Sequence, residues 1–313
     1  MAKAEPVRRF RWVPFAGQFV FPKDNALANT LVFKGGEIDP PPSTQDQSPP
    51  EAPNSLMPSK GVLSGKILSD QYFKEGRIKA QITFAAPEPD FRSFADIVIQ
   101  YDPDNDDMLS ASIGGFGSTG GPPLVSLRVW SRTNKDANLQ PQQGAVPKAW
   151  RTISSAGHRI ALQHGRPYDL EVVVRGSLVT ILLDGVVLVR RVLEFPLPGH
   201  QVGLFCSSAR DITFRNFTIA PVRPRAFVVM QYNTPAYEHV FEHVIKPLCD
   251  DDEIGLEAYR ADLECTPGIV LEDVQRKIQE SYVVIAEITP LNGSVYYEVG
   301  YADALQKPVV LMG

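Results

Sequence analysis

The sequence predicts a two-domain protein in which an all-β sandwich precedes an α/β domain with a parallel sheet. Its 313 residues are twice the roughly 150 residues of a typical domain. Up to Ile219, short β-type runs alternate with Gly, Pro, Asp and Ser clusters, and almost nothing repeats at helical spacing. Beyond Pro224, strand-like and helix-like runs alternate, which is typical of βαβ units.

Local patterns in the first part indicate antiparallel strands. The run GRIKAQITF at 76–84 is apolar at every second position, so it predicts a strand with one buried face. Asp184-Gly185 separates two β-type runs and supplies the positive φ angles of a tight hairpin. In DITFRNFTI the alternation shifts at Arg215-Asn216, as a β-bulge would produce. A series of such strands predicts a sandwich.

The prolines of Pro221-Val-Arg-Pro224 mark a linker, which divides the chain into domains 1–220 and 221–313. The second domain is expected to have four strands and three helices around a parallel sheet, with ligands beyond the carboxyl ends of the strands. One strand or helix expected of such a domain is absent from the sequence, which leaves open whether the domain is truncated. The predicted elements are strands at 226–230, 256–262, 281–288 and 307–312, and helices at 234–248, 269–282 and 294–305.

Charge and composition exclude several functions. With 31 basic and 36 acidic residues the net charge is −5, and no Lys/Arg cluster favours nucleic acid or anionic lipid. The apolar runs are far shorter than the roughly 18 residues of a membrane span, and the N-terminus lacks the apolar segment of a secretion signal. We therefore expect a cytoplasmic protein, and the absence of a CxxC pair agrees with a reducing compartment. The cysteines are Cys206, Cys249 and Cys265.

Four motifs follow one another in the second domain: AFVVMQY, YRAD, VVIAEITPLNGSVYYEVG and YADALQKPVVLM. In this order they resemble the bacterial TIR-like and nucleoside 2-deoxyribosyltransferase-like superfamily, which implies a flavodoxin-like fold. The resemblance covers residues 221–313 and departs from the family at Gln231-Tyr232, Glu287 and Ser294. In the first domain, LLDGVVLV and VGLFCSSARDITFRNFTI resemble concanavalin/laminin-G-type jelly rolls.

The resemblance implies an NAD glycohydrolase that releases nicotinamide, with Glu298 as the catalytic carboxylate. Glu298 would stabilise or attack the oxocarbenium-like sugar carbon, and its place near a helix N-terminus favours the ionised form by up to about 1 kcal/mol. NAD is the substrate, so neither a cofactor nor a metal is expected. The residues expected to bind the substrate are Gln231, Tyr232, Arg260, Asp262, Asn292 and Gly293.

By the same resemblance, the enzyme would be switched on by self-association and act in bacterial antiviral defence. The sandwich would sense a signal or assemble the oligomer. Two alternatives stay open: a nucleoside 2-deoxyribosyltransferase or nucleotide N-glycosidase using the same carboxylate, and a non-catalytic scaffold whose sandwich binds carbohydrate or protein.

Other patterns carry less weight. HVFEH at 239–243 matches a zinc motif, but Val244 and Leu248 lie on the expected buried stripe, which turns the histidines to solvent without a third ligand. The acidic run at 102–107 lacks the glycine of a calcium loop and predicts a hairpin turn. The tryptophans can stack on a sugar or fill the sandwich core, and the core is the default expectation. They are Trp12, Trp130 and Trp150.

Overall fold

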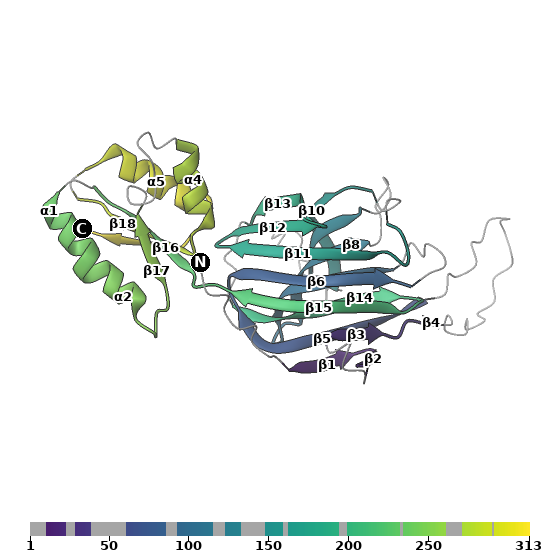
Figure 1. Ribbon diagram of the computed structural model, residues 1–313. Helices are drawn as coiled ribbons and strands as arrows, with labels where there is room; N and C mark the ends of the chain where they lie inside the picture. The colour runs from purple at the N-terminus through teal and green to yellow at the C-terminus, as the bar shows by residue number, and fades with distance from the viewer. Residues whose placement is uncertain are drawn as a thin grey trace, which may run out of the picture.

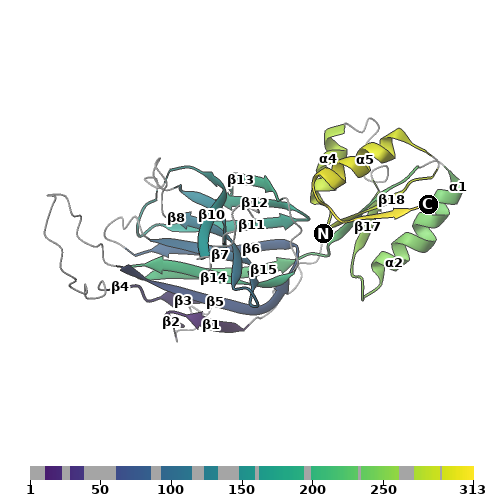
Figure 2. The same ribbon diagram turned by 180° about the vertical axis from the view of Figure 1, so that it is seen from behind.

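The computed structural model contains a two-sheet sandwich followed by a unit with a small parallel sheet (Figure 1). The lobe with the parallel sheet lies at one end of the sandwich strands, and Figure 2 shows the same arrangement from behind. The structure describes residues 11–22, 29–38, 61–85, 93–114, 123–132, 148–158, 162–193, 199–231, 234–260, 271–289 and 291–313.

The first sheet of the sandwich has eight strands within these ranges, in the order β1-β5-β14-β7-β8-β9-β10, with β4 paired to β5. All its pairs are antiparallel. The strands are Trp12–Ala16 (β1), Glu37–Ile38 (β4), Gly61–Phe73 (β5), Phe94–Asp102 (β7), Asp107–Gly114 (β8), Val125–Arg132 (β9), Lys148–Ala156 (β10) and His200–Ser208 (β14).

The second sheet has seven strands in the described residues, in the order β13-β12-β11-β6-β15-β3-β2, and is also antiparallel. The strands are Phe19–Val20 (β2), Thr30–Phe33 (β3), Gly76–Phe84 (β6), Pro167–Arg175 (β11), Leu178–Leu183 (β12), Val186–Val192 (β13) and Ile212–Pro221 (β15).

The local predictions for the sandwich are confirmed. Alternate residues of β6 are buried against the other sheet, as the 76–84 pattern predicts. Asp184 and Gly185 have φ of 50° and 81° in the β12–β13 turn, the positive values that a primed hairpin needs. The register of β15 with β6 shifts between Arg215 and Thr218, where Asn216 has φ of 51°.

In the second unit, four described strands form a parallel sheet in the order β17-β16-β18-β19. Helices α4 and α5 pack on one face of this sheet, and α1, η3 and α2 pack on the other. The elements are Arg225–Val229 (β16), Pro235–Val240 (α1), Phe241–Ile245 (η3), Lys246–Asp250 (α2), Glu257–Arg260 (β17), Leu271–Glu280 (α4), Val283–Glu287 (β18), Gly293–Ala304 (α5) and Val309–Met312 (β19).

The helix expected at 234–248 differs from its prediction. A π-helical turn, η3, comes just before Pro247, and the helix continues to Asp250. Proline cannot donate the usual helical hydrogen bond, and a wider turn accommodates it. The π-helical turn also changes which residues of this segment are buried. Val244 and Leu248 were expected to be buried, but they are 54% and 59% exposed.

Buried charges lie where the two units meet. Glu75, between β5 and β6, accepts a backbone hydrogen bond from Val222 through its carbonyl and is 2% exposed. Lys307, between α5 and β19, donates to the carbonyls of Gln279 and Ser281. The boundary at residue 220/221 falls just before the last residue of β15, and the division into two domains stays a prediction. The described helices include none with the length and apolarity to span a bilayer.

Candidate functional site

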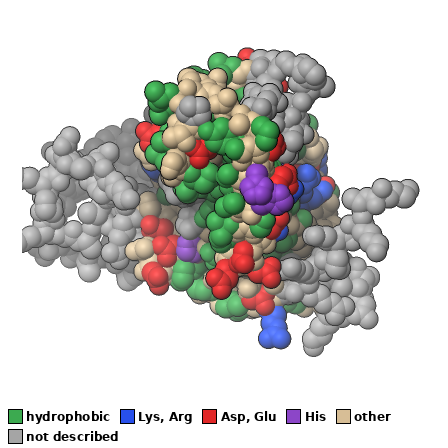
Figure 3. Space-filling model, turned by 90° about the vertical axis from the view of Figure 1, so that its left-hand side faces the viewer, with side chains coloured by type: hydrophobic (Ala, Val, Ile, Leu, Met, Phe, Trp, Pro, Cys, Tyr) green, Lys and Arg blue, Asp and Glu red, His purple; other side chains and the backbone are tan. Residues whose placement is uncertain are grey.

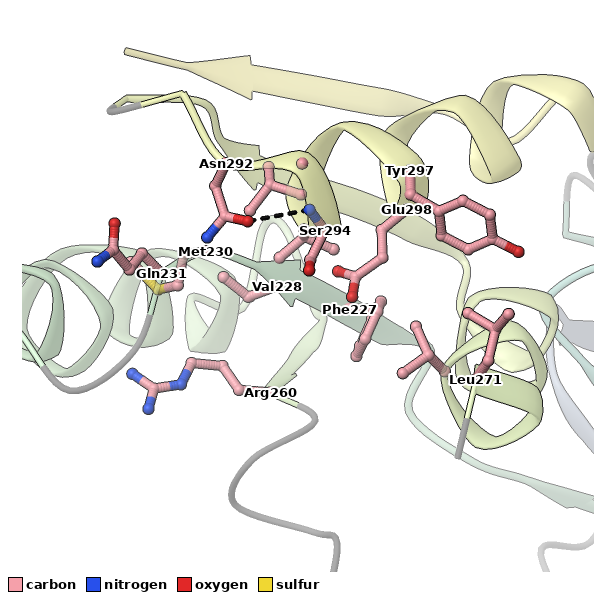
Figure 4. Close-up of a pocket in the computed structure, with 14 residues that line it drawn as sticks. Phe227, Val228, Met230, Gln231, Arg260, Leu271, Asn292, Ser294, Tyr297 and Glu298 are labelled. Atoms are coloured by element: carbon pink, nitrogen blue, oxygen red, sulfur yellow. Dashed lines mark hydrogen bonds between the residues drawn. The ribbon is translucent and has the colours of Figure 1, made fainter. Parts of the chain in front are cut away.

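A pocket of about 560 Å³ opens at the carboxyl ends of β16 and β17, beside the N-terminus of α5 (Figure 4). Ligands of parallel α/β sheets bind at this edge. The structure brings five of the predicted site residues to the lining of this pocket, whereas Tyr232 and Asp262 lie outside the described residues. The five are Gln231, Arg260, Asn292, Gly293 and Glu298.

The side chain of Glu298 extends from α5 into the pocket (Figure 4). Burial raises the pKa of its carboxyl group to about 7. The expectation that the helix N-terminus keeps Glu298 ionised is therefore wrong. Glu298 stands in the second turn of α5, where the helix dipole has faded, and the loss of water around the carboxyl dominates.

Arg260, at the end of β17, is tied to the helix on the opposite face of the sheet. Its guanidinium donates two hydrogen bonds, of 2.9 and 3.0 Å, to the carboxylate of Glu238 in α1. It also lies 4.8 Å above the ring of Phe241, and its side chain is 2% exposed. Its charge is thus compensated within the protein, and a role in binding a ligand stays a prediction.

Asn292 and Gly293 form the entry to α5. Oδ1 of Asn292 accepts a hydrogen bond of 2.9 Å from the backbone N–H of Ser294, so this side chain caps the helix. A Cβ added at Gly293 would meet no atom within 4 Å, so the pocket is open at this point. The amide of Gln231 lines the same pocket.

Sequence reasoning missed the apolar wall of this pocket. Phe227 and Val228 line it from β16, Leu271 and Val274 line it from α4, and Tyr297 lines it from α5. The first four looked like ordinary core positions. The position of Tyr297 next to Glu298 in the sequence was a signal that Tyr297 could also line the site.

A second candidate site lies on the outer face of the first sheet. Trp130, Trp150 and Phe205, which we call the aromatic cluster, are half-buried there. Ring centroids are 5.3 Å apart for Trp130 and Trp150, and 5.7 Å for Trp150 and Phe205. In a flat sheet, β10 and β14 would be on the order of 19 Å apart, because four strand spacings separate them. The contact therefore requires that the sheet curl toward its outer face.

A buried ion pair lies among these rings. Two nitrogens of the Arg128 guanidinium donate to the carboxylate of Asp96 at 2.8 to 3.2 Å, and Ser110 Oγ donates to the same carboxylate at 2.8 Å. The guanidinium lies 4.0 Å from the ring centroid of Phe94 and 4.1 Å from that of Trp150. Asp96 is fully buried and Arg128 is 5% exposed. The pair fixes the position of Trp150.

The expectation that the tryptophans fill the core is wrong for two of them. Trp12 packs against the main core, whereas Trp130 and Trp150 lie on the opposite face of their sheet. The sequence of β9 indicates this position for Trp130. Leu127 and Val129 point into the core, and alternate residues of a strand face opposite sides, so Trp130 points outward.

Within the described residues, the structure does not support a metal site at either metal-like pattern, 102–107 or 239–243. Among the described residues, no group of three or more His, Cys, Asp or Glu could hold a metal ion. The rings of His239 and His243 lie 4.5 Å apart, and Figure 3 shows histidine beside acidic and basic side chains on this side of the molecule. Asp102 accepts hydrogen bonds from Asp104 and Asn105, as an acidic turn does.

No family model matches the chain, and no curated protein is similar to it in sequence. Similar solved structures include the carbohydrate binding module CBM66 from Bacillus subtilis, with 14% identity over 66% of this chain and 93% of the other, at a TM-score of 0.40. A glycoside hydrolase family 16 endo-glucanase from Bacteroides ovatus has 10% identity over 65% and 92%, at 0.40. A galectin from Caenorhabditis elegans has 16% identity over 46% and 82%, at 0.26.

These findings correct the TIR-like and nucleoside 2-deoxyribosyltransferase-like resemblance. The similar solved structures are jelly-roll proteins named for carbohydrate binding or glycoside hydrolysis. The small parallel sheet does not establish a flavodoxin-like TIR domain. The predicted NAD glycohydrolase activity, its enzyme class and the role in antiviral defence are wrong on the same findings. NAD as a substrate and self-association have no support.

Proposed function

We propose that the protein binds carbohydrate on the outer face of the first sheet. The observation that carries this proposal is the aromatic cluster, whose half-buried rings lie on the side toward which the sheet curls. An outward face in contact with water alone would be expected to carry polar side chains at these positions. Three partly exposed aromatic rings on this face instead provide a surface for a ligand.

The chemistry of the cluster suits a sugar. A pyranose ring presents C–H groups on its faces and hydroxyls around its edge, so it stacks on an aromatic ring while its hydroxyls form hydrogen bonds. Each indole supplies an apolar face and one N–H donor. The Asp96–Arg128 pair holds the ring of Trp150 from beneath, so the stacking surface is in place before the ligand arrives.

Polar groups border the same outer face. Tyr101 packs with Leu68 and Met108 next to the aromatic cluster. Its hydroxyl donates to Asp106, and Lys66 Nζ donates to the same carboxylate at 2.7 Å. Asp106 is half-exposed. Such groups can bind sugar hydroxyls at the edge of the stacked ring.

Affinity electrophoresis tests this function, with a neutral β-1,3-1,4-glucan and a sulfated galactan as probes in separate gels. We expect at least one polysaccharide to retard the protein, and Trp150→Ala to lose at least about tenfold in affinity, because a stacking surface is removed. Tyr72→Ala is the matched control, since Tyr72 is an exposed aromatic residue of the same sheet outside the cluster. Retardation equal in Trp150→Ala and wild type, or no retardation by either probe, would contradict the proposal.

A further inference from the structure

Among the described residues that line the pocket beside α5, one carboxyl group has no partner that compensates its charge. Glu298 and Arg260 are the charged residues among its described lining. The Arg260 guanidinium is bound to Glu238, and in Figure 4 it extends away from Glu298. Within the described part of the chain, the Glu298 carboxyl has neither a hydrogen bond nor an ion pair, and burial alone raises its pKa.

Part of the wall around this carboxyl is apolar, and polar residues at the entry to α5 form another part. Phe227 and Val228 form the floor from β16, and Leu271 and Val274 form one side from α4. The volume of about 560 Å³ is within the range of small-molecule sites. A carboxylate facing such walls loses hydration without gaining a partner, which is costly unless a ligand supplies the opposite charge.

We propose that this pocket binds a small organic cation, with a flat apolar body and an amidinium, guanidinium or ammonium group directed at Glu298. A planar cation can donate two parallel hydrogen bonds to the carboxylate. The apolar body then lies against Phe227 and Leu271, and the Tyr297 ring offers an aromatic face to the positive charge. This site is separate from the proposed carbohydrate surface, so either proposal can fail alone.

Protonation of Glu298 opposes such binding. The pKa of the carboxyl is about 7, so the fraction that is ionised rises between pH 6 and 8, and cation affinity rises with it. Within the described lining, the other titratable groups are Arg260 from β17, which Glu238 neutralises, and Tyr297 from α5. From α4 and β16 the described lining is apolar. Glu298 therefore controls the pH dependence in this range.

Calorimetric titration with benzamidine and its neutral analogue benzamide tests the proposal on the full chain. At pH 8 we expect benzamidine to bind at least about tenfold more tightly than benzamide, and at pH 6 its affinity to fall by roughly tenfold as the carboxyl takes up its proton. Glu298→Gln removes the preference for the cation. Glu242→Gln keeps it, because Glu242 is a surface carboxyl paired with Lys246 on the helix segment η3.

A second variant tests the charge without changing Glu298. Leu271 lines the pocket and is 54% exposed, so Leu271→Lys places a competing cation at the rim while the fold is retained. Both probes lose the apolar contact with Leu271, and only benzamidine is also repelled by the new charge, so its affinity is expected to fall at least about threefold more than that of benzamide. Equal affinities for the two probes, a cation preference that survives in Glu298→Gln, or no binding of either probe would overturn the proposal.

Discussion

The outer face of the sandwich and the pocket beside α5 each contain a carboxyl group that is shielded from bulk water. The two groups differ in the hydrogen-bond partners that the protein provides. Asp96 receives two guanidinium nitrogens and a hydroxyl, and aromatic rings lie over the guanidinium. Glu298 faces an open cavity with partly apolar walls and has, among the described residues, no partner. The first arrangement is complete without a ligand, and the second is not.

The difference separates the roles of the two regions. A carboxylate with all its hydrogen bonds made inside the protein positions its neighbours, so on the outer face the ligand-binding groups are the rings above the ion pair. A carboxyl without a partner is itself available to a ligand. The Arg260–Glu238 pair falls between these limits, whereas Glu75 is buried and, among the described residues, neither of its carboxylate oxygens has a hydrogen bond. Four substitutions compare the effects of these cases on stability.

The largest effect is expected for Asp96→Ala. Removing one partner of a buried pair leaves the Arg128 guanidinium buried and uncompensated, which costs about 3–5 kcal/mol of the free energy of unfolding. Urea denaturation measures it. Asp273→Ala, which breaks an exposed pair with Arg276, should cost no more than about 0.5 kcal/mol. Similar losses in both variants would show that Asp96 is not the buried, fully bonded group described here.

Glu75 should make stability fall as pH rises. Burial raises the pKa of its carboxyl from 4.5 to about 7, although the Gly176 backbone and the charges of Arg175, Lys307 and Arg225 oppose the rise. Between these pH values the unfolded chain has lost the proton and the folded chain retains it, so the free energy of unfolding decreases. Relative to Glu75→Gln, wild type should lose up to about 3 kcal/mol between pH 4.5 and 7.

Urea denaturation of both proteins at several pH values measures this loss. The pKa of Lys307 is lowered to about 7 by burial, and this lysine is present in both proteins. The charge of Glu75 raises the pKa of Lys307, so the comparison reports the titration of the carboxyl at position 75 together with its effect on Lys307. A constant difference between wild type and Glu75→Gln from pH 4.5 to 7 would contradict the assignment.

A smaller loss, of about 1 kcal/mol, is expected for Glu238→Gln. The Arg260 guanidinium loses its charged acceptor, but the side chain of Glu238 is 44% exposed, so water moderates the cost. Thermal unfolding at pH 7 measures the change. A loss as large as that of Asp96→Ala would mean that the Arg260 pair is as isolated from water as the outer-face pair.

Glu298→Gln should stabilise the protein at high pH. The pKa of Glu298 is raised to about 7, so the folded protein bears the cost of an ionised carboxyl fully only above that pH. At pH 8 the variant should be more stable than wild type by up to about 3 kcal/mol, because burial has removed water from the ionised carboxyl of the wild type. At pH 4.5 and below, the two proteins should have the same free energy of unfolding. If Glu298→Gln is less stable than wild type at pH 8, the conclusion that the Glu298 carboxyl has no partner is wrong.

Local sequence patterns were sufficient for much of the fold. Alternation in 76–84, the Asp184-Gly185 turn and the Asn216 bulge depend on neighbours in the chain, and each is confirmed. The parallel sheet followed from the alternation of strands and helices. The exposed side of the first helical segment was mispredicted, because the π turn before Pro247 changes the helical spacing.

The candidate sites were harder to predict from the sequence than the fold. The curl of the first sheet brings Trp150 to Phe205, and Arg260 pairs with Glu238 across 22 positions, so neither contact has a local pattern. Five predicted site residues do line one pocket. The family and activity inferred from the same motifs were wrong, because short motifs in a parallel sheet specify where a ligand could bind more firmly than which ligand it is.

The most direct test of the carbohydrate proposal is a crystal structure of the protein soaked with a β-1,3-1,4-glucan oligosaccharide. The account predicts a sugar ring stacked on the outer-face rings of Trp130 and Trp150, with the Asp96–Arg128 pair intact beneath it. A sugar bound in the pocket beside Glu298, or elsewhere with the aromatic cluster empty, would contradict it.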